Sequence, residues 1–113
     1  MPDERRIVCV DLNGVLNLYD GFRGADYIHP PRPGAKEFLE ALRERGYRVV
    51  VFTDRWAPQV EEWLERAGLR LFVEEVTDRK PPAHAFIDDR AICFRGDYAE
   101  SLAALDAFRA HWE

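Results

Sequence analysis

The chain is poor in the features that mark secreted, membrane and nucleic-acid-binding proteins. Its 113 residues include only two cysteines, Cys9 and Cys93, which are too few for a disulfide framework. Both lie in apolar runs, so we expect buried free thiols in a reducing cytoplasm. No apolar run approaches membrane-spanning length, and the net charge of −5 disfavours a surface that neutralises nucleic-acid phosphates. The overall composition, 47% hydrophobic and 33% charged, predicts one globular domain over residues 1–113.

Short apolar runs alternate with amphipathic segments along the chain, which predicts a mostly parallel α/β sheet. The expected strands lie at residues 7–10, 49–53, 71–73, 85–87 and 91–94. The expected helices lie at 34–45, between Pro58 and Gly68, and from Asp97 onward, the last with Leu102, Leu105, Phe108 and Trp112 on its inward face. Trp56 and Trp63 fall on the apolar side of the middle helix, which favours packing in the core.

Polar residues stand where three of these strands end: Asp11, Thr53, and Asp88 with Asp89. The carboxyl ends of parallel strands meet at one edge of a sheet, where α/β proteins bind ligands. Carboxylates gathered there repel one another unless a cation lies between them, and such oxygen ligands suit Mg²⁺. Thr53 and Lys80 could contact a phosphoryl group, and Asp11 could attack phosphorus to form an aspartyl-phosphate. Taken singly, each residue is more simply explained as a turn residue, a helix cap or a solvated lysine.

Four segments in this order resemble the motifs of the haloacid dehalogenase-like superfamily. Residues 10–16, Val-Asp-Leu-Asn-Gly-Val-Leu, resemble its first motif, an apolar strand followed by Asp-x-Asp-Gly-(Thr/Val)-Leu. Phe52 with Thr53 resembles the second motif, Lys80 the third, and residues 86–89 the acidic fourth. The resemblance implies a three-layer, Rossmann-like parallel sheet without a cap domain, and a cytoplasmic Mg²⁺-dependent phosphohydrolase.

The same resemblance implies a role for each matching residue. Asp11 would be the nucleophile and a magnesium ligand. The backbone carbonyl of Asn13 would be a further metal ligand, and Asp88, with Asp89 as an additional candidate, would complete the metal site. Thr53 and Lys80 would bind the phosphate, and Lys80 would also shield the charge on Asp11.

One position departs from the family pattern: Asn13 stands where phosphatases of the family carry a second aspartate that acts as acid and base. An amide transfers no proton at a useful pKa, so a contribution of about 10²–10⁴-fold is expected to be missing, although Asn13 can still orient a leaving oxygen or a water. Four interpretations stay open. They are a slow phosphatase, a phosphatase with another acid (Asp20, Asp26 or His29), a phosphate- and metal-binding module without turnover, and a phosphotransferase.

The spacings around the motifs leave room for a short flap and no cap domain. An open site suits a phosphorylated small molecule or macromolecule, or a site that a second copy of the chain closes. Arg55 and Arg90, next to the second and fourth motifs, are candidate substrate contacts. Nucleic-acid ends are less favoured because the chain is acidic. Tyr19, Phe22 and Tyr27 either attach the flap to the core, which is the favoured interpretation, or form a stacking surface for a base or sugar.

Overall fold

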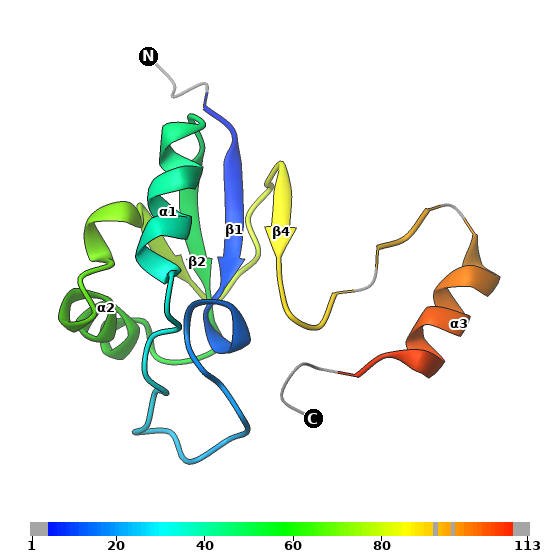
Figure 1. Cartoon of the computed structure of the whole chain (residues 1–113), viewed down its shortest axis with the longest axis horizontal. Helices are drawn as coiled ribbons and strands as arrows, with labels where there is room; N and C mark the ends of the chain where they lie inside the picture. Colours follow the sequence, from blue (N-terminus) through cyan, green and yellow to red (C-terminus); the bar gives the residue numbers. More distant parts are fainter. Residues whose placement is uncertain (1–4, 92, 96, 110–113) are drawn as a thin grey trace.

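A parallel four-stranded sheet forms the centre of the computed structural model, which describes residues 5–91, 93–95 and 97–109 (Figure 1). In spatial order the strands are β3 (Glu75–Thr77), β2 (Arg48–Phe52), β1 (Ile7–Asp11) and β4 (Ala85–Ile87). Asp11 pairs with Phe52, and Val10 pairs with Ile87, so β1, β2 and β4 end at the same edge of the sheet. The expected parallel α/β sheet without a cap domain is confirmed.

Two amphipathic helices pack against this sheet and create the core. They are α1 (Ala35–Glu44) and α2 (Ala57–Arg66). The inward residues of α1 include Leu39 and Leu42, and those of α2 include Trp63 and Leu64, all of them buried. The β-branched residues of β1 and β2 are buried at successive positions, as expected for central strands of a parallel sheet. None of the described helices has the length and hydropathy needed to span a membrane.

The predictions of strands at residues 71–73 and 91–94 are wrong. The first turn after α2 is a short 3-10 helix at Arg70–Phe72, and the third strand comes later, at Glu75–Thr77. The reason is spacing: Leu69 and Val73 are buried four residues apart while Leu71 is exposed, which is the pattern of a turn. The described residues of the expected fifth strand, 91, 93 and 94, are exposed and form no strand.

The last helix, α3 (Tyr98–Ala107), begins where expected but does not pack where expected. Its start is capped by Asp97, whose carboxylate accepts the backbone N–H groups of Ala99 (2.9 Å) and Glu100 (3.3 Å). The prediction of a buried face is wrong, because Leu102 is 62% exposed and Leu105 is exposed as well. An extended segment after β4 carries the chain away from the sheet, so that α3 lies apart from it (Figure 1).

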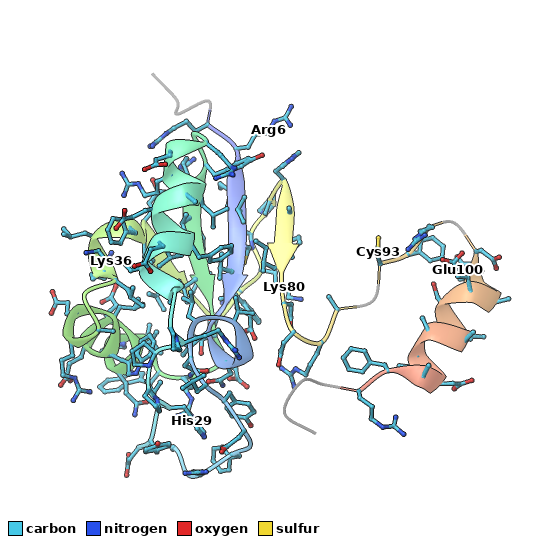
Figure 2. All side chains as sticks on the ribbon, viewed as in Figure 1. Arg6, His29, Lys36, Lys80, Cys93 and Glu100 are labelled. Atoms are coloured by element: carbon cyan, nitrogen blue, oxygen red, sulfur yellow. The ribbon has the colours of Figure 1, made fainter. Side chains whose placement is uncertain are left out.

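The remaining residues of that expected inward face are Phe108, which is half-buried, and Trp112, which lies outside the described residues. The same segment carries Cys93, so the expectation of two buried thiols holds only for Cys9 on β1, and Cys93 is exposed (Figure 2).

Candidate active site

Three carboxylates converge at the edge where β1 and β4 end. Asp11 is the last residue of β1, and Asp88 and Asp89 directly follow β4. One oxygen from each lies within 4.8 Å of the others. Asp11 is 8% exposed, and its Oδ2 is buried with no hydrogen-bond partner among the described residues. The structure therefore brings the predicted acidic residues together, and it leaves a buried carboxyl oxygen of Asp11 without a donor among the described residues.

The surroundings of Asp11 raise the pKa of its carboxyl group. Burial, followed by the charges of Asp88 and Asp89, raises the pKa of Asp11 from its ordinary value of 3.8 to about 7. Arg90 and the backbone N–H of Leu12 act in the opposite direction and lower that pKa. Buried oxygens of this kind are satisfied by a cation, so the three carboxylates fit a divalent metal ion that prefers oxygen ligands. Asp11, Asp88 and Asp89 are the side chains that could hold it.

The turn after β1, Leu12–Leu16, determines how Asn13 faces the site. Gly14 adopts a left-handed conformation (φ 87°), and its backbone N–H donates to Oδ1 of Asn17 at 3.0 Å. Because a backbone N–H can only donate, this contact fixes the orientation of the Asn17 amide. The Nδ2 of Asn17 then donates to Oδ1 of Asn13 at 3.0 Å. This bond engages the Oδ1 of Asn13, and its NH₂ group, which can only donate, remains for contacts with a ligand.

The two predicted phosphate ligands occupy different surroundings. Thr53 is buried directly after β2, beside the β1 strand, and its Oγ1 accepts the backbone N–H of Arg55 at 3.1 Å. Lys80 is exposed beside β4 (Figure 2), with its Nζ 5.4 Å from the ring of Phe52 and 5.5 Å from the ring of Phe86. Its charge lowers the pKa of the Cys9 thiol, which burial raises overall. The cation that lowers the pKa of Asp11 is Arg90.

A cavity of about 350 Å³ opens beside the acidic cluster. Its lining includes Asn13 and Asp89 from the cluster side, and both predicted substrate contacts, Arg55 and Arg90. The Nε of Arg90 lies 3.8 Å from a carboxylate oxygen of Asp89, which makes it part of the same charged wall. The cavity lining also includes Asp54, which lies between Thr53 and Arg55 in the sequence. A ligand in this cavity would contact both the cluster and the two arginines.

The flap between the first turn and α1 is held by a buried histidine. His29 is 2% exposed, and its Nε2 lies 2.8 Å from Oδ1 of Asp20. Tyr19 and Tyr27 pack edge-on against its ring, at 5.1 and 4.8 Å between centroids. The indole N–H of Trp63 donates to the His29 carbonyl at 3.1 Å, which joins the flap to α2. The two tyrosines thus attach the flap to the core.

The candidate replacement acids do not reach the cavity in this arrangement. Asp20 and His29 are engaged with each other in the flap, and neither they nor Asp26 are part of the cavity lining. The placement of Trp56 also differs from prediction: it is 74% exposed at the cavity, because it precedes α2 in an extended conformation instead of lying on its inner face.

Motif analysis missed one further residue of the site, Asn17. It is fully buried although it is polar, and it holds both Gly14 and Asn13. The only signal for it in the sequence is an asparagine inside an otherwise apolar stretch, which does not reveal a partner.

Comparisons with known proteins agree with this arrangement. The model of the family described as haloacid dehalogenase-like hydrolase matches residues 9–112. A solved structure of a conserved protein from Bacteroides thetaiotaomicron has the same fold, with a TM-score of 0.61 and 20% identity over 92% of each chain. No match was found among the curated proteins. The chain belongs to the haloacid dehalogenase-like hydrolase family.

Proposed function

We propose that this hydrolase is a Mg²⁺-dependent phosphatase in which Asp11 is the nucleophile. The observation that carries the proposal is the Oδ2 of Asp11, which is buried within the acidic cluster without a hydrogen-bond partner among the described residues. A carboxylate oxygen in such a place retains its lone pairs for a metal ion or for a phosphorus atom. The neighbouring carboxylates and the raised pKa of Asp11 argue that a cation completes the site.

The reaction would proceed in two steps. A carboxylate oxygen of Asp11 forms a bond to phosphorus while the bond from phosphorus to the leaving oxygen breaks, and the alcohol departs with a proton from water. Water then attacks the phosphorus of the aspartyl-phosphate and releases phosphate and the free carboxylate. A bound Mg²⁺, held by Asp11, Asp88 and Asp89, would keep Asp11 ionised and neutralise the charge of the phosphoryl group.

The remaining side chains would position the substrate. The hydroxyl of Thr53, at the end of β2, would donate to a phosphoryl oxygen while it continues to accept the N–H of Arg55. The long, flexible side chain of Lys80 lies beside β4, and its Nζ would approach the phosphate when the substrate binds. Asn13 would donate a hydrogen bond from its Nδ2 to the leaving oxygen, because its Oδ1 is already engaged by Asn17.

A second function is favoured by one observation, the amide of Asn13 at the position where phosphatases of the family carry a carboxylate. An amide donor cannot take a proton from the water that attacks the aspartyl-phosphate, so the second step is expected to be the slow one. A chain with this property could retain the phosphoryl group for transfer to an acceptor, or bind phosphate and metal without turnover.

The experiment that tests the proposal is Mg²⁺-dependent hydrolysis of an activated aryl phosphate by three proteins: the natural chain, Asp11→Asn and Asn13→Asp. We expect slow hydrolysis by the natural chain and none by Asp11→Asn. Asn13→Asp should be faster by about 10²-fold or more, since it restores a proton-transferring group. Hydrolysis that survives Asp11→Asn would refute the nucleophile, and activity in Asn13→Asp alone would favour the transfer or binding function.

A further inference from the structure

The cavity beside the acidic cluster has two walls that come from different parts of the chain and are tied together. One wall is the flap, which includes Phe22 and Ala25, and the other is the start of α2, which includes Arg55 and Gln59. Nη1 of Arg55 and Nε2 of Gln59 both donate to the carbonyl of Ala25, at 3.3 and 3.0 Å. These bonds join the flap to the start of α2 and hold the two walls of the cavity together.

Each wall presents a large aromatic side chain to this cavity. Phe22 of the flap is 73% exposed and Trp56 of the α2 wall is 74% exposed. Tyr19 also lines the cavity, but it and Tyr27 pack edge-on against the buried His29. Packing against the core therefore explains the two tyrosines, but it does not explain why Phe22 and Trp56 both stand at one cavity.

The polar residues that line the cavity indicate which kind of ligand would reach the rings of Phe22 and Trp56. Asn13 and Asp89 place the cluster at one side of the cavity, where the reacting phosphate would be held. Arg55 and Arg90 line the same space and supply positive charge for the phosphate or for polar atoms of the leaving group. A molecule that reaches from the cluster to the aromatic residues thus needs an anionic end and a planar, apolar end.

We propose that the cavity lined by Phe22 and Trp56 is the subsite for a planar aromatic ring, and that the substrates are phosphomonoesters whose leaving group carries such a ring. This inference deepens the proposed phosphatase function and rests on it. Stacking on one or both side chains would make the ring, and not the size of the leaving group, the basis of selection.

Two matched substrate pairs test the ring directly. Benzyl phosphate and cyclohexylmethyl phosphate have similar size and similar leaving alcohols, but only the first has a planar ring. Adenosine 5′-monophosphate and ribose 5-phosphate differ in the presence of a base. We expect kcat/KM to favour the ring-bearing member of one pair by about tenfold. The pair that shows this preference identifies the ring as that of a simple arylmethyl ester or of a nucleotide base.

Variants connect the preference to the cavity. Phe22→Leu and Trp56→Leu should each reduce the ratio of kcat/KM within that pair toward one. Tyr98→Leu is the control, because Tyr98 is an exposed aromatic residue on α3 outside the cavity, and it should leave the ratio unchanged. Equal rates within both pairs for the natural chain would overturn the subsite, and so would a preference that survives both cavity variants.

A binding measurement separates this inference from the phosphatase proposal. Calorimetry with benzylphosphonate and cyclohexylmethylphosphonate, which cannot be hydrolysed, reports ring selection without turnover. Tighter binding of the benzyl compound that Trp56→Leu removes would support the subsite even if no ester is hydrolysed. Equal binding, or no binding of either compound, together with equal rates for adenosine 5′-monophosphate and ribose 5-phosphate, would contradict the subsite even if Asp11-dependent hydrolysis is found.

Discussion

The raised pKa of Asp11 predicts that the metal-free protein loses stability as the pH rises. The folded state retains the Asp11 proton up to about pH 7, whereas the unfolded chain releases it near its ordinary value of 3.8. Between these values the folded state binds more protons, so the free energy of unfolding falls with increasing pH. One pKa unit corresponds to about 1.4 kcal/mol, and the fall between about pH 5 and about pH 8 amounts to about 3 kcal/mol.

The assay is urea unfolding in the presence of a chelator, followed by tryptophan fluorescence at several pH values across this range. Asp11→Asn is the control, because it retains the size of the side chain and removes the titrating group. We expect the variant to lose most of the pH dependence. We also expect Mg²⁺ to flatten the profile of the natural chain, since a bound cation keeps Asp11 ionised. An equal slope in Asp11→Asn and the natural chain would refute the assignment of the raised pKa to Asp11.

Three further predictions concern the metal site, the turn and the last helix. Millimolar Mg²⁺ should raise the melting temperature of the natural chain, and Asp88→Asn should reduce that shift; an equal shift in the variant would remove Asp88 from the metal site. Asn17→Ala should destabilise the fold by about 1–3 kcal/mol in urea unfolding, because it leaves the buried N–H of Gly14 without its acceptor; a smaller loss would show that another acceptor replaces it. Leu64→Ala should cost about 2–5 kcal/mol and Leu102→Ala less than about 0.5 kcal/mol, because only Leu64 is buried; similar losses would show that α3 packs on the core.

The position of the acidic cluster could be predicted because it depends on local pattern. Apolar runs end at Asp11 and at Asp88, and strands of a parallel sheet bring such ends together. The structure pairs β1 directly with β4 and places both residues at one edge of the sheet.

Residues whose role depends on a partner across a turn or a gap could not be predicted in this way. The Asn17 side chain reaches Gly14 and Asn13 only because Gly14 has a positive φ, which no periodicity reveals. Trp56 matches the helical spacing of Trp63, yet the helix begins one residue later, and the extended backbone at Trp56 directs it outward. The spacing of the apolar residues around Leu102 predicts an apolar helix face, but it does not identify the element that would cover this face. In the structure Leu102 is exposed.

The central claim, that Asp11 carries the phosphoryl group, is tested most directly by trapping the intermediate. The protein is incubated with Mg²⁺ and a reactive phosphodonor, reduced with borohydride, digested and analysed by mass spectrometry. Because Asn13 cannot activate water, the aspartyl-phosphate should accumulate, and reduction should convert residue 11 to homoserine in a Mg²⁺-dependent manner. Substrate turnover with an unmodified Asp11, or homoserine at another aspartate, would contradict the account.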